Sequence, residues 1–131
     1  MHLLFVVGSG TCPYTIKAVS TLAEHNISFV YIAITSPQMK QDMIEKLGPI
    51  ANNIKHTLPI LILLKKTDRG YDIFEWKEPQ DSSSMVQEVI NCKLTMKTCK
   101  NTLLTTMFTT VKNSNEAIQM CKDHTSFVYC F

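Results

Sequence analysis

The start of the chain places a strand signal, a tight turn and a helix signal in direct succession, and this order limits the folds open to it. The run Leu3–Val7 is short, apolar and closed by Gly8-Ser9-Gly10, which is typical of a buried strand. Apolar residues then recur at helical spacing from Ile16 to Ala23. The pattern predicts a strand over about His2–Val7 and a helix over about Pro13–His25.

The corner between these two elements reads Thr-Cys-Pro-Tyr-Thr over residues 11–15. Pro13 suits the first helical position, where no backbone N–H is needed, so Cys12 becomes the N-cap. Its sulfur then faces unpaired backbone N–H groups and the positive end of the helix dipole. That environment stabilises the thiolate. The corner therefore predicts that Cys12 is an exposed nucleophile, and a buried structural cysteine is the alternative interpretation.

Composition bounds the class of protein. The chain has 131 residues, 45% of them hydrophobic and 18% charged, with a formal net charge of +2. This is typical of a globular protein with one real core, and the charge is too small to indicate a nucleic-acid partner. We expect neither a signal peptide nor a membrane span. Five cysteines without a signal peptide indicate a reducing compartment, so we expect a cytoplasmic protein.

The rest of residues 1–91 continues the alternation of strands and helices. Ser36 is a good N-cap for a second helix, which Gly48-Pro49 ends, and Asp68-Arg69-Gly70 predicts a hairpin turn. The further expected elements are a strand over 29–34, a strand over 60–64, a strand over 71–76 and a third helix that begins within Asp81–Ser84. The predicted order is β-α-β-α-β-β-α, with a parallel opening pair and later antiparallel neighbours.

Three of these features together resemble the glutaredoxin family of the thioredoxin superfamily. They are Cys12-Pro13-Tyr14 at the start of the first helix, Thr57-x-Pro59 before the third strand, and the order of the elements. The resemblance covers residues 1–91. It implies an α/β, thioredoxin/glutaredoxin-like fold, in which a four-stranded mixed sheet is flanked by three helices and followed by a C-terminal extension, residues 92–131. It also implies a cis Pro59 close to Cys12.

The same resemblance implies glutathione as the cofactor. The backbone of Leu58 would pair with the cysteinyl unit of glutathione, while Asp81 and Ser82 would receive its γ-glutamyl end. Pro13, Tyr14, Thr15 and Pro59 would support Cys12. The full set of implied glutathione-binding residues is Lys55, Thr57, Leu58, Asp81 and Ser82, with His56 beside Lys55 as a further partner for the glycine carboxylate.

Thr15 stands where the family has its second active-site cysteine, which leaves Cys12 as the one thiol of the motif. We therefore expect a glutathione-dependent thiol–disulfide oxidoreductase that removes glutathione from protein substrates by a monothiol mechanism, with the Thr15 hydroxyl donating to the thiolate. Two alternatives stay open. One is a thioredoxin-fold binding or assembly module with weak or lost catalysis, because Gly8-Ser9-Gly10 lacks the family's lysine and Glu78-Pro79-Gln80 replaces its Gly-Gly pair. The other is a 2Fe-2S carrier, in which two protomers each give Cys12 and two glutathiones complete the ligands.

Residues 92–131 lie outside the resemblance. Residues 103–111 fit helical and strand periods equally, Ser114-Asn115-Glu116 starts a short capped helix, and Phe127–Phe131 is an added strand or an anchor. The extension would pack on the domain or form a homodimer. Cys92, Cys99, Cys121 and Cys130 lack the spacing of a metal site. Each is interpreted as an independent thiol, or one of them is a resolving cysteine for Cys12, and the sequence does not rank them.

Overall fold

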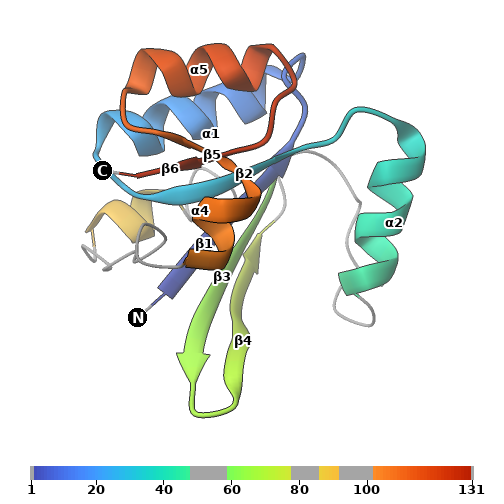
Figure 1. Cartoon of the computed structure of the whole chain (residues 1–131), viewed down its shortest axis with the longest axis vertical. Helices are drawn as coiled ribbons and strands as arrows, with labels where there is room; N and C mark the ends of the chain where they lie inside the picture. Colours follow the sequence, from blue (N-terminus) through green and yellow to red (C-terminus); the bar gives the residue numbers. More distant parts are fainter. Residues whose placement is uncertain (1, 48–58, 78–85, 92–101, 131) are drawn as a thin grey trace.

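The computed structural model is an α/β protein (Figure 1), and it describes residues 2–47, 59–77, 86–91 and 102–130. Residues 86–91 are helical, within the predicted third helix, while Gly48-Pro49 and the caps at Asp81–Ser84 lie outside the described residues. The other elements are β1 (His2–Gly8), α1 (Pro13–Glu24), β2 (Phe29–Ala33), α2 (Pro37–Leu47), β3 (Ile60–Thr67), β4 (Gly70–Lys77), α4 (Thr102–Met107), β5 (Thr109–Val111), α5 (Ser114–Lys122) and β6 (Phe127–Tyr129).

These strands form one mixed sheet of six, in the order β4-β3-β1-β2-β6-β5. β1 and β2 are parallel, and β3 and β4 are antiparallel to their neighbours. β6 pairs antiparallel with β2, and β5 pairs parallel with β6. The predicted number of four strands is wrong, because residues 109–129 add two strands beside β2 that the resemblance did not include.

Local signals place the first strands and helices as predicted. The Ser36 side chain accepts a hydrogen bond from the Met39 N–H at 3.2 Å at the start of α2. In the β3–β4 hairpin Thr67 pairs with Gly70, whose φ of 127° suits glycine. The ambiguous stretch 103–111 resolves into both structures, since α4 ends at Met107 and β5 begins at Thr109.

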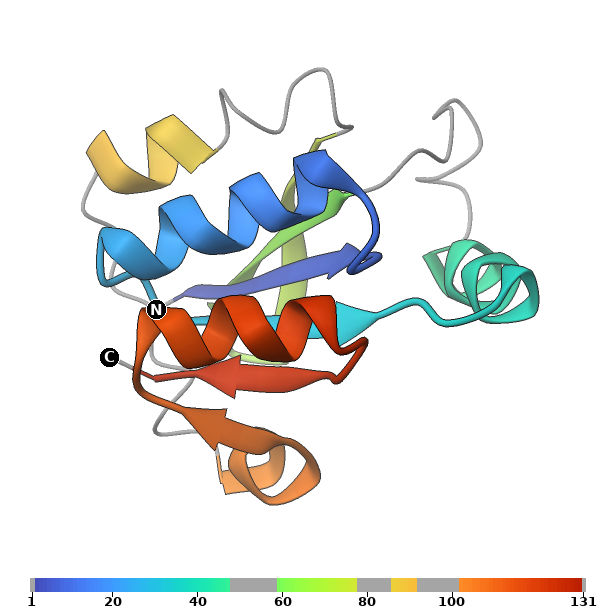
Figure 2. The same ribbon diagram turned by 90° about the horizontal axis from the view of Figure 1, so that it is seen from above.

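Helices α1 and α5 lie side by side on one face of the sheet, as both views show (Figures 1 and 2). They cover the buried side chains of Leu4, Val6, Phe29, Tyr31, Leu61, Phe127 and Tyr129. The opposite face buries a second cluster, in which Leu104 of α4 packs with Leu3, Val30 and Val128. Burial of each large aliphatic side chain contributes roughly 1.5–3 kcal/mol, so β2, covered on both faces, is central to stability. Within the described part of the chain no helix is both long and apolar enough to cross a membrane.

A four-residue repeat relates the two ends of the sequence. Ser-Phe-Val-Tyr occurs at Ser28–Tyr31, which enters β2, and again at Ser126–Tyr129, which enters β6. Each copy follows a helix that ends in the same way, with a residue of positive φ: Asn26 at 59° and His124 at 60°. The backbone N–H groups of these residues and of their successors donate to carbonyls in the last helical turn at 3.0–3.2 Å, which is the Schellman arrangement.

The two copies pair with each other in a self-complementary register. Val30 lies opposite Val128 at the centre, Phe29 lies opposite Tyr129, and Tyr31 lies opposite Phe127. The corresponding ring pairs have centroids 5.5 Å and 5.2 Å apart. The units β1-α1-β2 and β5-α5-β6 are therefore related by an approximate two-fold axis through the centre of the β2–β6 pair.

Asn113→Ala tests whether the added unit contributes to the stability of the whole fold. The Asn113 side chain caps α5 by accepting from the N–H groups of Asn115 at 2.8 Å and Glu116 at 3.3 Å. Its loss should lower the free energy of unfolding by about 1 kcal/mol, measured by urea denaturation. Asn115→Ala, which keeps the capping side chain, is the control and should cost less. Equal stabilities for the two variants would show that the cap contributes nothing.

Candidate active site

Cys12 occupies the N-cap of α1, and the predicted position of Pro13 at the start of the helix is confirmed. A turn from Ser9 leads into the cap, since the Cys12 N–H donates to the Ser9 carbonyl at 3.0 Å. Cys12 is partly exposed, while Pro13 and Tyr14 are exposed, with 65% of Tyr14 accessible to solvent. The first turn of α1 holds no acidic residue, so no carboxylate there opposes a negative charge on the sulfur.

Thr15 points into the protein below this corner. It is fully buried, and its hydroxyl accepts from the Ser9 N–H at 3.4 Å. A Cβ at position 8 would collide with the Thr15 side chain, so Gly8 is needed where β1 ends. Thr15 thus holds the turn that presents Cys12, and the predicted hydrogen bond from its hydroxyl to the Cys12 thiolate stays a prediction.

Pro59 lies at the same end of the sheet as the Cys12 corner. Val7 of β1 pairs with Ile60 of β3, so the antiparallel register brings the buried Pro59 next to the end of β1, where the turn to Cys12 starts. The other residues implied by the resemblance, Lys55, His56, Thr57, Leu58, Asp81 and Ser82, lie outside the described residues. The structure therefore places Cys12, Thr15 and Pro59 of the predicted site at the same end of the sheet.

Helix α5 adds a second cysteine to this corner. α1 and α5 run antiparallel (Figure 2), so the last turn of α5 reaches the loop before α1. A Cβ on Gly10 would collide with the Cys121 carbonyl oxygen and lie 3.1 Å from the His124 ring. Gly10, two residues before Cys12, is therefore packed directly on the backbone of Cys121. Cys121 is fully buried, and both Cys12 and Cys121 are present as thiols.

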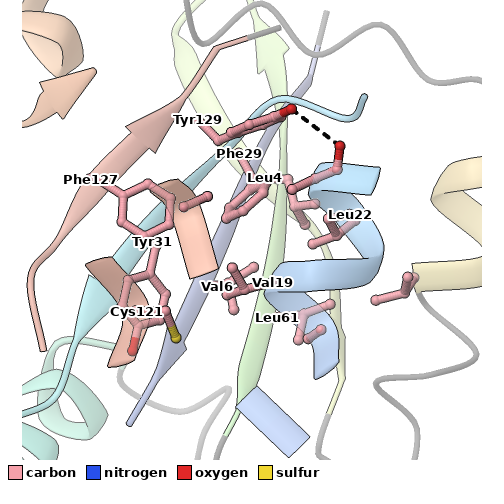
Figure 3. Packing of buried hydrophobic residues seen from close by; sticks show 14 of the residues in the cluster. Leu4, Val6, Val19, Leu22, Phe29, Tyr31, Leu61, Cys121, Phe127 and Tyr129 are labelled. Atoms are coloured by element: carbon pink, nitrogen blue, oxygen red, sulfur yellow. Dashed lines mark hydrogen bonds between the residues drawn. The ribbon is translucent and has the colours of Figure 1, made fainter. Parts of the chain in front are cut away.

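The buried hydroxyl of Tyr31 lies beside the Cys121 sulfur (Figure 3). It makes no hydrogen bond of standard geometry to any group that the structure describes. Its counterpart in the repeat, Tyr129, donates to the Ala23 carbonyl at 3.2 Å. The equivalent acceptor for Tyr31 would be the Cys121 carbonyl, because Ala23 and Cys121 occupy the same position before the two helix ends. The approximate symmetry is broken at this hydroxyl.

Cys12, Tyr31 and Cys121 form one electrostatic cluster. Burial raises the pKa of the Cys121 thiol, the Tyr31 hydroxyl and Lys122 act in the opposite direction, and the charge of Cys12 raises it further. Burial also raises the pKa of Tyr31, and the nearby Cys121 side chain and the charges of Cys121 and Cys12 raise it further. At neutral pH, Tyr31 is therefore a protonated donor next to a buried thiol.

The remaining cysteines do not join this cluster in the described structure. Cys130 belongs to the cluster on the opposite face of the sheet and is disulfide-bonded, and Cys92 and Cys99 lie outside the described residues. The interpretation of Cys130 as an independent thiol is therefore wrong. Disulfides are rare in proteins of reducing compartments, so the prediction of a cytoplasmic protein did not lead us to expect this bond.

Sequence reasoning missed Tyr31, and the repeat was the signal that could have found it. Two copies of Ser-Phe-Val-Tyr in one chain predict two equivalent tyrosines, and the structure then shows that only Tyr129 has its hydrogen-bond acceptor among the described residues. The described residues hold no group of three His, Cys, Asp or Glu side chains able to bind a metal ion. Comparisons with protein-family models, curated proteins and solved structures find no match. The site is therefore interpreted from its own geometry.

Tyr129→Phe and Tyr31→Phe form a matched pair, because both remove one hydroxyl from the same repeat. Tyr129→Phe removes the hydrogen bond to Ala23 and should lower the free energy of unfolding by about 1 kcal/mol. Tyr31→Phe removes a buried hydroxyl without a standard partner in the described structure, so stability should stay equal or rise. Urea denaturation measures both, and an equal loss in the two variants would contradict this account of Tyr31.

Stability should fall as the pH rises above the ordinary thiol pKa of about 8.5. In the unfolded chain Cys121 ionises there, whereas its raised pKa keeps it protonated in the fold. The native state then binds more protons, so the free energy of unfolding falls by up to about 1.4 kcal/mol per pH unit. The titratable groups that act on Cys121 are Tyr31, Lys122 and Cys12, and the His124 ring lies beside Gly10, which packs on the Cys121 backbone. Cys121→Ala should flatten this slope in urea denaturation between about pH 8.5 and 10, and an unchanged slope would contradict the shift.

Proposed function

We propose that this chain is a glutathione-dependent thiol–disulfide oxidoreductase of the glutaredoxin type, with Cys12 as its nucleophile. The observation that carries the proposal is the partly exposed Cys12 at the N-cap of α1, where a turn from Ser9 leads from β1 into the helix. The reactive form of cysteine is the thiolate, and a residue at this position lies at the end of the helix where unpaired backbone N–H groups are presented.

The strand arrangement supports the same proposal. The portion β4-β3-β1-β2, with β1 and β2 parallel and the other two antiparallel, is the mixed sheet that the resemblance to glutaredoxins implies. The register also sets Pro59 at the end of the sheet where the Cys12 turn begins. On this interpretation β5, α5 and β6 are additions to a thioredoxin-like fold, made at the free edge of β2.

The proposed reaction exchanges thiols and a disulfide. The Cys12 thiolate attacks the glutathione sulfur of a glutathionylated protein, so that a Cys12–glutathione disulfide forms and the substrate leaves as its thiolate. A second glutathione thiolate then attacks the glutathione sulfur of this adduct and releases glutathione disulfide together with Cys12. Thr15, buried against Gly8 with its hydroxyl on the Ser9 N–H, holds the turn that presents the sulfur.

The test measures the rate at which glutathione reduces a glutathionylated peptide in the presence of the protein. The released peptide thiol is the quantity that is monitored. Cys12→Ser should lower the rate to that of the uncatalysed reaction, because serine cannot form the disulfide intermediate. Glu24→Gln, a change at the exposed far end of α1, is the control and should keep the wild-type rate. Thermal unfolding of both variants checks that they are folded.

Two results would overturn the proposal: a wild-type rate no faster than the uncatalysed one, or full activity in Cys12→Ser. The first result would favour the alternative of a binding or assembly module, in which the corner is retained without catalysis.

A further inference from the structure

We propose that Cys121 is a resolving cysteine for Cys12, and that the Tyr31 hydroxyl is positioned to donate a hydrogen bond to the Cys121 thiolate. The inference rests on the proposed function, since it needs a disulfide on Cys12 to resolve. It changes the expected mechanism, because the second thiol comes from α5 and not from the position of Thr15 in the motif.

The packing of α5 against the loop before α1 supports the pairing of these two cysteines. Gly10 lies directly on the Cys121 carbonyl, with no room for a side chain between them. Cys12 follows two residues later, and its charge acts on both Cys121 and Tyr31. Of the four cysteines outside the motif, Cys121 is the one that the structure describes as a thiol on the α1 face of the sheet.

The unsatisfied hydroxyl of Tyr31 is the independent observation. Buried hydroxyls are almost always hydrogen-bonded, because a buried hydroxyl without a partner lowers stability. The same hydroxyl in Tyr129 is satisfied by the Ala23 carbonyl, so the scaffold provides a way to avoid this cost. At Tyr31 the neighbouring group is the Cys121 sulfur (Figure 3). A thiolate there would accept the hydrogen bond that the hydroxyl otherwise lacks.

The burial of Cys121 separates the tasks of the two thiols. Cys121 is fully buried, so a protein substrate or glutathione disulfide cannot reach its sulfur directly. Cys12 is partly exposed and reacts first. Cys121 then reacts with the Cys12 adduct from inside the protein, and the glutathione bound to Cys12 is released without a second glutathione.

The steps balance. The Cys12 thiolate attacks glutathione disulfide, a Cys12–glutathione bond forms, and one glutathione thiolate leaves. The Cys121 thiolate then attacks the Cys12 sulfur, the Cys12–glutathione bond breaks, and the Cys12–Cys121 bond forms. The departing glutathione thiolate takes up the proton that Cys121 lost. In sum, two protein thiols and one glutathione disulfide give one protein disulfide and two glutathione molecules, and two further glutathiones reverse the reaction.

The test follows the full chain, isolated with Cys12 and Cys121 as thiols, after addition of glutathione disulfide. Samples are quenched with acid, their intact masses are measured, and the disulfides are located by peptide mapping. The wild type should pass through a short-lived glutathione adduct to a Cys12–Cys121 disulfide. In Cys121→Ala the adduct on Cys12 should persist at least about tenfold longer, and Cys12→Ser should take up no glutathione at this site.

The outcomes separate the two proposals. A wild-type adduct that persists as long as in Cys121→Ala, or a bond from Cys12 to a different cysteine, overturns the resolving role and leaves the proposed function standing. Absence of both an adduct and a disulfide on Cys12 overturns the proposed function as well. The peptide map of the wild type decides the matter even if Cys121→Ala does not fold.

Tyr31→Phe and Tyr129→Phe test the positioning role of the hydroxyl with a matched pair. Tyr31→Phe should leave formation of the Cys12 adduct unchanged and slow its conversion to the disulfide about tenfold, since a hydrogen bond to a charged group is stronger than one between neutral groups. The conversion should also require a higher pH, which a purely structural effect would not produce. Tyr129→Phe should keep the wild-type conversion rate and pH profile. Equal slowing in both variants, or none in Tyr31→Phe, would overturn this role of Tyr31.

Discussion

The antiparallel pairing of β2 with β6 is the interaction on which the rest of this structure depends. Val30 lies opposite Val128, and the rings of the aromatic residues on either side are in contact across the strands. The pair is buried on both faces of the sheet. It joins the two β-α-β units and brings α1 and α5 into contact on one face. Because the two strands carry the same four residues, a single register places the equivalent side chains of both strands on the same faces of the sheet.

This near-symmetry also explains where the candidate site lies. A two-fold axis between antiparallel strands makes the two helices antiparallel, so the start of α1 meets the end of α5. Cys12 and Cys121 are brought to one corner by that relation. Equivalent positions in the two units have diverged there: Ala23 corresponds to Cys121, and the hydroxyl of Tyr31 has lost the kind of acceptor that Tyr129 retains.

Local sequence signals predicted the elements well where one short stretch decides the outcome. The turn of glycines, Pro13 and the apolar spacing defined β1, the N-cap and α1, and Ser36 and Gly70 defined a helix start and a hairpin. The strand count was wrong because the resemblance ended at residue 91. Phe127–Tyr129 has the composition of a strand, but only its pairing partner reveals that it extends the sheet beside β2.

The sequence by itself determined that Cys12 would start a helix after a strand, because caps, turns and periodicity act within a few residues. It could not determine which distant residues would lie near Cys12, because nothing in the linear sequence ranks the four other cysteines. Tertiary structure decided this by pairing β2 with β6 and packing Gly10 on the Cys121 backbone. The physical reason is that contacts between residues so far apart in the sequence depend on burial of the whole core and on the exclusion of other registers.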